Sequence, residues 1–315
     1  MDFGCVFPNR GALATPANLA RVAEQAEVLG YDTVWFSDHI IIPTEVKSFY
    51  PYHPSGQMQF NPSEPYWEPL TAMSYVAGRT SRIRLGTSVL ILPYRNPLVT
   101  AKTLATLDVL SNGRVTLGAG VGWMEEEFKA LGLDTYPRRG AYSDECIRIL
   151  RVLWTQENPS FKGEFHQFAN VRCEPRPVQP GGIPIWVGGH TAPAVRRAGR
   201  LADGWQPLVQ RPPADLPPAE MKEKITQLRA FAEAAGRDPR QITLAMGSSI
   251  QFGDGMASGQ HSLFSGSPAQ IVESIQRYQE LGVQNFRCDF PSTSLEGLLG
   301  AMERFATEVR PKVAS

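Results

Sequence analysis

Patterns of buried strand and amphipathic helix alternate eight times along this chain of 315 residues. Runs rich in β-branched and aromatic residues predict the strands, and apolar residues spaced three and four apart predict the helices. The predicted strands span residues 2–7, 33–37, 83–92, 115–121, 183–187, 202–205, 242–250 and 285–290. Eight right-handed strand-to-helix connections in succession close into a barrel. The sequence therefore predicts an α/β fold of the (β/α)8 TIM-barrel type, with a doubly wound open sheet as the alternative.

One domain accounts for the whole chain, because no stretch has the composition of a linker between domains. We expect a single barrel domain over residues 1–315, with insertions at about 40–67, 124–180 and 251–266. The first and last strands of a barrel are neighbours, so Cys5 and Cys288 are predicted to be two buried thiols on adjacent strands.

Charge balance and cysteine spacing narrow the classes of partner. Lys plus Arg and Asp plus Glu both number 31, so the formal net charge is zero, which argues against nucleic acid or an anionic membrane as a partner. The N-terminus lacks the basic and apolar regions of a signal peptide, and no apolar run is long enough to span a bilayer. The four cysteines lack metal-ligand spacing, so we expect reduced thiols, no metal site and a cytoplasmic location.

The second predicted strand ends in three hydrogen-bonding side chains, Ser37, Asp38 and His39. In α/β folds the chemistry lies at the carboxyl ends of the strands. His39 is therefore a candidate functional residue. The alternative is a strand followed by a solvated loop, in which His39 is only hydrogen-bonded at the surface.

The connection 40–67 is unusually long and is rich in proline and aromatic residues. Long loops in compact domains are commonly functional or disordered, and so many aromatic side chains argue against disorder. Two interpretations stay open, a lid over a substrate and a contact between subunits.

A candidate phosphate site lies where Gly188, Gly189, His190 and Thr191 join a strand to a helix. Thr191 is the predicted N-cap, and Pro193 follows in the first turn. Free amides at a helix N-terminus and glycines without a Cβ favour an anion. The alternative is ordinary capping of the helix.

Five segments together resemble the luciferase-like flavin and deazaflavin oxidoreductase family. They are residues 30–39, 84–97, 111–123, 185–189 and 201–205. Each motif alone is weak, but the five occur in order at barrel spacing, and the similarity covers essentially the whole chain. Members of that family are (β/α)8 barrels with an extra insertion, which agrees with the predicted alternation.

The resemblance implies that the carboxyl end of the barrel holds FMN or the deazaflavin coenzyme F-420. The Ser-Asp-His strand end is more similar to the deazaflavin branch. His39 would then give or take the proton that accompanies hydride transfer, and Asp38 would orient the His39 ring or bind the cofactor. A non-proline cis peptide between Ser88 and Val89 would back the cofactor ring, with Thr87 beside it. The cofactor phosphate would lie at the turn 188–191.

One departure from the family concerns the substrate. Some deazaflavin dehydrogenases have an acidic residue after the Gly-x-Gly of the fourth strand, where this chain has Trp123. We interpret Trp123, together with Tyr50 and Trp67 of the long connection, as the wall of a site for a mostly apolar organic substrate. The next acids, residues 125–127, open a helix, where the dipole favours carboxylates in any case. Residues 252–265, rich in glycine and serine, are predicted either to close over the site or to be disordered.

The leading hypothesis is an oxidoreductase that transfers a hydride between coenzyme F-420 and a small organic molecule. One alternative is an FMN-dependent monooxygenase, in which reduced flavin and dioxygen attack the substrate. Another is a flavin-binding protein without catalysis. The resemblance also makes a homodimer the expected assembly.

Overall fold

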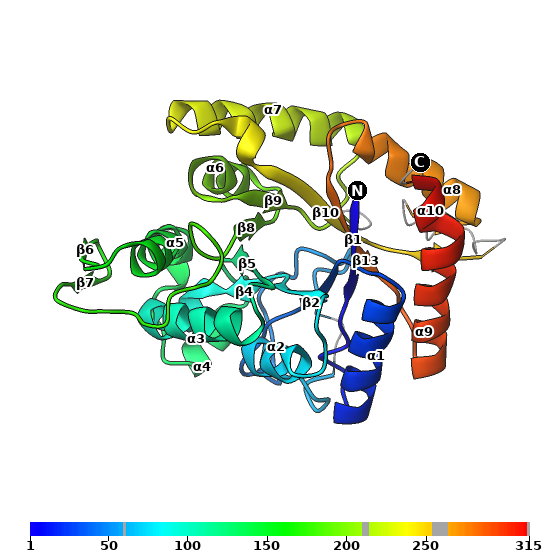
Figure 1. Ribbon diagram of the computed structural model, residues 1–315, viewed down its shortest axis with the longest axis horizontal. Helices are drawn as coiled ribbons and strands as arrows, with labels where there is room; N and C mark the ends of the chain where they lie inside the picture. Colours follow the sequence, from blue (N-terminus) through cyan, green and yellow to red (C-terminus); the bar gives the residue numbers. More distant parts are fainter. Residues whose placement is uncertain (59–60, 210–213, 254–263, 314–315) are drawn as a thin grey trace.

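The computed structural model describes residues 1–58, 61–209, 214–253 and 264–313. Eight parallel strands follow one another in the order β3, β2, β1, β13, β10, β9, β8 and β5, and β3 also pairs with β5, which closes the ring. Helices surround this ring (Figure 1). The closed ring confirms the predicted TIM barrel and excludes the open doubly wound sheet.

The strands of the ring are short and close to their predicted positions. They are β1 (Asp2–Val6), β2 (Thr33–Phe36), β3 (Arg84–Thr87), β5 (Val115–Gly120), β8 (Ile185–Gly188), β9 (Gly204–Gln206), β10 (Thr243–Ser249) and β13 (Asn285–Asp289). Outside the ring lie β4 (Leu90–Ile91), β6 (Phe161–Lys162), β7 (Gln167–Phe168), β11 (Gln251–Phe252) and β12 (Ser265–Gly266).

The α-helices are α1 (Pro16–Val28), α2 (Pro69–Ala77), α3 (Pro97–Leu110), α4 (Glu125–Ala130), α5 (Arg139–Thr155), α6 (Ala192–Leu201), α7 (Pro218–Ala234), α8 (Pro268–Gln279), α9 (Leu295–Arg304) and α10 (Arg310–Val313). Shorter helical turns cover Leu92–Tyr94, Tyr136–Arg138 and Pro239–Gln241, and a π-helical turn covers Phe305–Val309.

Local sequence sets several helix starts. Thr15 and Asn96 cap α1 and α3 through their side chains, and Ser267 with Gln270 forms the capping box of α8.

The third strand is shorter than predicted. We expected one strand over residues 83–92, but β3 ends at Thr87, and the chain resumes as β4, which pairs with β5. The break lies at the Ser88–Val89 peptide bond, which is cis, as the resemblance implied. Within the predicted insertion 124–180, β6 and β7 pair as a short antiparallel hairpin.

Glycines make room for two large aromatic side chains in the barrel. A Cβ at Gly4 or Gly86 would overlap the indole of Trp35, which is buried. Trp186 lies beside it with the ring centroids 5.4 Å apart, and a Cβ at Gly204 would come within 2.5 Å of Trp186. Large side chains opposite small ones fill a barrel without voids.

The two neighbouring thiols, Cys5 and Cys288, lie where the topology predicts. Cys5 of β1 and Cys288 of β13 are direct neighbours in register, and both are buried free cysteines. Burial raises the pKa of the Cys5 thiol to about 12 and that of Cys288 well above its usual value. Both are therefore unreactive thiols of the core.

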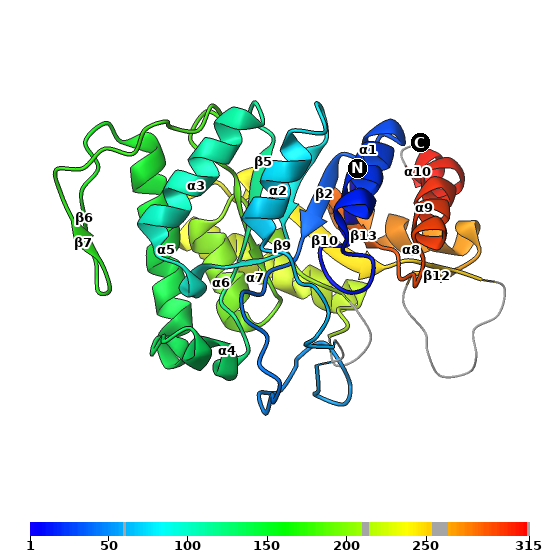
Figure 2. The ribbon, with the colours of Figure 1, turned by 90° about the horizontal axis from the view of Figure 1, so that it is seen from below.

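The loops that follow the strands gather at one end of the barrel. In Figure 2 residues 40–58, drawn in blue, extend below the ring on the same side as α4. Candidate residues from distant parts of the sequence are thereby brought to one mouth. Residues 254–263 lie outside the described residues, so the expectation for the segment 252–265 stays a prediction.

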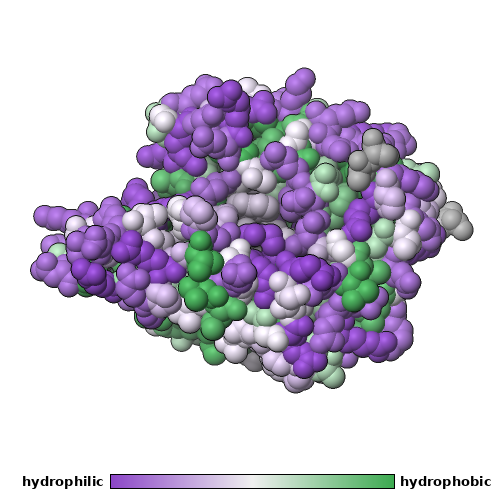
Figure 3. Space-filling view, in the orientation of Figure 1, coloured by the Kyte–Doolittle hydropathy of each residue, from purple (hydrophilic) through white to green (hydrophobic). Residues whose placement is uncertain are grey.

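The face of the molecule shown in Figure 3 is mostly hydrophilic, with hydrophobic residues in small separate patches. Across the ranges described above, no helix has both the length and the apolar character needed to cross a membrane.

The β6–β7 hairpin projects to one side of the molecule in Figures 1 and 2, and one buried carboxylate ties it to α5. Glu145 of α5 accepts hydrogen bonds from the backbone N–H groups of Glu164, Phe165 and His166, and its Oε1 lies 3.0 Å from Nδ1 of His166. Burial acts to raise the pKa of Glu145, but these hydrogen bonds outweigh burial, so its pKa is lowered from 4.5.

The Glu145 contacts should stabilise the fold in a pH-dependent way. A carboxylate whose pKa is lower in the folded state stabilises that state above its unfolded pKa, and the effect is lost as the pH falls through the folded pKa. We expect Glu145→Gln to lower the free energy of unfolding near pH 7, and the difference from wild type to shrink below about pH 4.5. Urea unfolding of both proteins at several pH values measures this. A difference that stays constant with pH would contradict the assignment.

Candidate active site

His39 follows the end of β2 and is held by a carboxylate of α4. Its Nδ1 lies 2.5 Å from Oε2 of Glu127. The Glu127 side chain is 0% exposed and that of His39 is 11% exposed. Because Glu127 is bonded at Nδ1, the second ring nitrogen, Nε2, faces away from the carboxylate.

Aromatic rings surround the His39 imidazole. Tyr66 meets it edge to face with the centroids 5.2 Å apart, and Trp123 does so at 6.3 Å. Tyr50 in turn contacts Trp123 at 5.0 Å. Burial raises the pKa of the Tyr66 hydroxyl, which therefore stays protonated. The structure thus brings two predicted wall residues, Trp123 and Tyr50, to the candidate proton-transfer residue.

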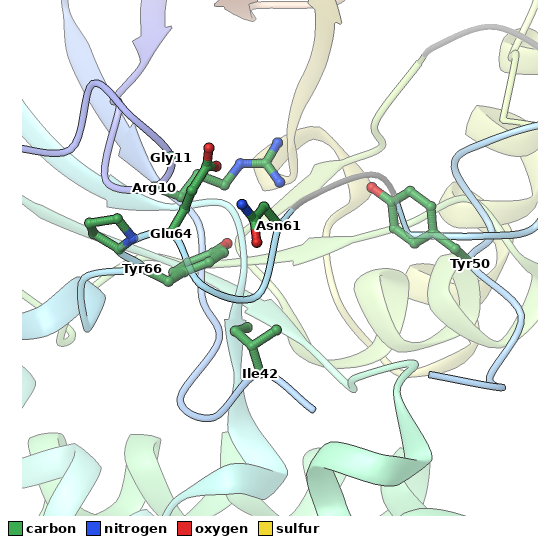
Figure 4. Close-up of a pocket in the computed structure, with 8 residues that line it drawn as sticks. Arg10, Gly11, Ile42, Tyr50, Asn61, Glu64 and Tyr66 are labelled. Carbon is green, nitrogen blue, oxygen red and sulfur yellow. The ribbon is translucent and has the colours of Figure 1, made fainter. Parts of the chain in front are cut away.

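A cavity of about 390 Å³ opens beside Tyr66. It is lined by Arg10, Gly11, Ile42, Tyr50, Asn61, Glu64, Pro65 and Tyr66. In Figure 4 the polar ends of Arg10, Glu64 and Asn61 gather on one side of it, whereas Ile42 and the ring of Tyr50 lie apart from them. Its volume is in the range of small-molecule sites, and its lining combines charged and amide groups with the side chains of Ile42, Tyr50 and Tyr66.

Asp38 does not take the role toward His39 expected of it. Its Oδ1 and Oδ2 accept hydrogen bonds from the Arg95 guanidinium at 2.8 and 2.7 Å, and Oδ2 also accepts one from the backbone N–H of Ile91 at 2.8 Å. Its side chain is 0% exposed. Burial acts to lower the pKa of Arg95, but pairing with Asp38 and Glu68 outweighs burial and raises that pKa. The expectation that Asp38 orients the His39 ring is wrong, because Asp38 is paired with Arg95 and Glu127 holds the ring. The expected contact of Asp38 with the cofactor stays a prediction.

The Ser88–Val89 bulge lies between neighbouring strands of the barrel. The Val89 side chain reaches between Gly120 and Gly188, since a Cβ at Gly120 would overlap it and one at Gly188 would lie 2.6 Å from it. Behind the bulge, Nη1 of Arg287 donates to Oγ of Ser88 at 2.5 Å. Arg287 is buried, and burial lowers the pKa of its guanidinium.

Thr87 supports this bulge rather than facing the mouth. Its hydroxyl donates to the carbonyl of Gly118 at 2.8 Å, and the residue is 0% exposed. The expected cofactor contact of Thr87 stays a prediction, and the burial of this residue gives it no support. Thr87 ties β3 to β5.

The turn 188–191 leads into α6 as predicted. Thr191 is the N-cap, but its side chain makes no capping hydrogen bond in the part of the chain that the structure describes. Gly189 has a φ of +88°, which favours glycine. Nδ1 of His190 is buried and has no hydrogen-bond partner among the described residues. Burial lowers the pKa of His190. The helix start thus keeps donor groups for an external acceptor.

Trp67 lies apart from the other predicted wall residues. Its Nε1 donates to the carbonyl of Ala14 at 3.0 Å, and its backbone N–H donates to the carbonyl of Asn9 at 2.8 Å. It thereby fastens the long connection to the loop after β1. Its neighbour Tyr66 contacts His39 instead. Sequence patterns did not identify Tyr66 and Glu127 as site residues. An aromatic-rich loop does not show which of its rings faces the site, and a run of three glutamates does not show which carboxylate does.

Within the described ranges, no group of three or more His, Cys, Asp or Glu side chains could hold a metal ion. The site is therefore built from one histidine on a carboxylate, an aromatic wall with a cavity, and a helix N-terminus open to an anion. Together with the closed barrel, these features define a barrel enzyme whose chemistry lies at the carboxyl ends of the strands.

The particular family follows from comparison with known proteins. The model of the luciferase-like monooxygenase family matches residues 1–261, and the chain belongs to that family. It is therefore a luciferase-like oxidoreductase, and its relatives include F420-dependent dehydrogenases.

Two relatives illustrate the extent of the similarity. An uncharacterized protein of Mycobacterium tuberculosis is 30% identical over 315 residues, covering 98% of this chain and 99% of the relative. An F420-dependent glucose-6-phosphate dehydrogenase of Kineococcus radiotolerans is 35% identical over 273 residues, covering 85% of this chain and 70% of the relative.

Solved structures show the same fold. The monooxygenase RslO1 from Streptomyces bottropensis superposes with a TM-score of 0.77 at 23% identity, covering 99% of both chains. An F420-dependent secondary alcohol dehydrogenase, solved with an F420-acetone adduct, also gives a TM-score of 0.77, at 19% identity, covering 99% of this chain and 98% of the other.

Proposed function

We propose that this chain is a coenzyme F-420-dependent oxidoreductase that acts on a small, mostly apolar organic substrate. The observation that carries the proposal is His39, held through Nδ1 by a buried carboxylate at the barrel mouth, next to an aromatic-walled cavity. Relatives named as F420-dependent dehydrogenases support this choice of cofactor.

The residues present fit the cofactor. The turn 188–191 offers a helix N-terminus, a glycine at positive φ and the buried Nδ1 of His190, a combination suited to a phosphate. The Ser88–Val89 bulge lies next to this turn, because the Val89 side chain fills the space that a Cβ at Gly188 would need. We propose that the turn holds the phosphate and that Ser88 and Val89 back the ring. When bound, the deazaflavin supplies the hydride chemistry.

The chain itself supplies proton transfer and binding. Glu127 contacts His39 at Nδ1, so we expect Nε2 to be the atom that gives or takes a proton during the reaction. Tyr66, Trp123 and Tyr50 limit the access of water to this nitrogen and offer an apolar surface. Arg10 and Glu64, on one side of the cavity, are placed to bind a polar end of the substrate.

The test is a fluorescence titration of the purified protein with coenzyme F-420 and, separately, with FMN. We expect saturable binding of the deazaflavin and much weaker binding of FMN, followed by reduction or oxidation of the bound deazaflavin when the right substrate is added. Free phosphate serves as a competitor that occupies the turn 188–191 alone.

The other outcomes would overturn the proposal. Binding of FMN alone, with oxygen consumption by the reduced flavin, would make the chain a monooxygenase, as its family model is named. Tight binding of a flavin with no turnover would make it a binding protein. A cytoplasmic homodimer also stays a prediction, which sedimentation of the purified protein and fractionation of cells would check.

A further inference from the structure

Glu127 makes more hydrogen bonds than a helix N-terminal carboxylate needs. Its Oε1 accepts from the backbone N–H groups of Ile40 and Ile41, at 2.7 and 3.2 Å. Its Oε2 lies 2.9 Å from the hydroxyl of Tyr94 and 2.5 Å from Nδ1 of His39. These partners come from the loop after β2 and from the turn before α3, so four groups converge on one buried carboxyl.

The partners indicate the charge state of this carboxyl. Two backbone N–H groups can only donate. Burial, reinforced by the neighbouring Glu127, raises the pKa of Tyr94, so its hydroxyl keeps its proton and donates as well. Three donors to one carboxyl favour its ionised form, and toward an ionised acceptor Nδ1 carries the proton.

The surroundings strengthen these hydrogen bonds. Ile91, Tyr94 and Phe128 form a small apolar cluster against which Ile40 and Val89 pack, and Glu127 lies next to Phe128 in α4. In such a water-poor setting, hydrogen bonds to a charged acceptor are stronger and better oriented than in solvent.

We propose that Glu127 is the positioning residue that fixes the tautomer of His39. It keeps a proton on Nδ1 in both the neutral and the charged ring, so that proton exchange is confined to Nε2. This inference rests on the proposed role of His39 in proton transfer, but the placement of the proton is testable without any cofactor.

The neighbouring carboxylate separates this role from simple loop anchoring. Glu126 accepts hydrogen bonds from the backbone N–H groups of Lys47 and Ser48, at 2.8 and 3.0 Å. The Ser48 hydroxyl in turn accepts from the N–H of Glu125 at 3.0 Å. Both Glu126 and Glu127 thus fasten the connection 40–67 to α4, but only Glu127 contacts His39, which makes Glu126→Gln a matched control.

The first experiment is nitrogen-15 NMR of the histidine rings in the cofactor-free protein in mildly alkaline buffer. The chain has 5 histidines, and the His39 signals are those absent from His39→Asn. We expect wild type and Glu126→Gln to show a proton on Nδ1. In Glu127→Gln the amide donates to Nδ1 instead, so the proton should move to Nε2. A wild-type His39 with the proton on Nε2 alone would overturn the proposal, and this result needs no variant to fold.

Kinetics of the loaded enzyme give the second readout. Because Nε2 then has the wrong protonation state, Glu127→Gln should lower kcat by roughly 100-fold with little change in the substrate KM. Glu126→Gln should keep kcat within about threefold of wild type, and any effect of this substitution should appear in KM. Unchanged kcat in Glu127→Gln, despite a displaced proton, would overturn the proposal. Failure of the titration with coenzyme F-420 would instead contradict the proposed function and leave the NMR result intact.

Discussion

Replacing His39 by asparagine is expected to lower kcat by about a thousandfold, the range that general acid–base catalysis supplies. The asparagine amide can donate to Glu127 from nearly the position of Nδ1, so the hydrogen bond that fastens the loop is kept. It has no group at the position of Nε2, so no proton is given or taken there. Single-turnover measurements with the bound deazaflavin would isolate this step from binding and product release.

The matched measurement for His39→Asn is the affinity for coenzyme F-420, which should stay within a few-fold of wild type. The turn 188–191 and the Ser88–Val89 bulge are separate from His39, and the substitution leaves them in place. Full turnover in a variant that binds the cofactor would show that His39 is not the proton-transfer residue. A variant that binds no cofactor would instead assign His39 to binding.

Gly118→Ala should be among the most destabilising single substitutions in the barrel. A Cβ at Gly118 would overlap the carbonyl oxygen of Thr87, which is backbone and cannot rotate away. The strands β3 and β5 would have to separate at the point where they close the ring, next to the Ser88–Val89 bulge. We expect a loss of about 3 kcal/mol in the free energy of unfolding and weaker cofactor binding.

The control for Gly118→Ala is the same change at Gly300. This glycine is exposed within α9, and a Cβ there would meet no atom within 4 Å. Alanine restricts the unfolded chain and favours the helix, so Gly300→Ala should raise stability by about 0.5–1 kcal/mol. Urea unfolding of the two variants and wild type compares them directly. Equal midpoints for Gly118→Ala and wild type would contradict the close approach of β3 to β5.

The order and the ends of most elements could be predicted from the sequence. The predicted strands 33–37, 115–121 and 285–290 match β2, β5 and β13 to within one residue, and Thr191 with Pro193 marks the start of α6. The capping box of Ser267 and Gln270 likewise predicts α8. Such signals act within one turn of chain, so they need no tertiary structure.

The third strand shows where local signals fail. The sequence predicted one strand over residues 83–92, but β3 stops at Thr87. The Thr87 hydroxyl donates a hydrogen bond to the carbonyl of Gly118, 31 residues along the chain. At the next residue, Arg287 donates a hydrogen bond to the Ser88 hydroxyl. Periodicity carries no information on such cross-strand contacts. The cis bond was expected only through resemblance to the family.

The sequence by itself determined the barrel, the place of His39 at the end of a buried strand, the glycine-containing turn 188–191 before α6 and the neighbouring thiols. These follow from the period of apolar residues, from capping and from the order of strands in a closed ring. Only the tertiary structure decided which side chains pair with Asp38 and His39. Asp38 pairs with Arg95, 57 residues away, and His39 with Glu127, 88 residues away. By sequence alone, either Asp38 or Glu127 could have been the hydrogen-bond partner of His39. The closed barrel and α4 place the Glu127 side chain, buried, beside the His39 ring.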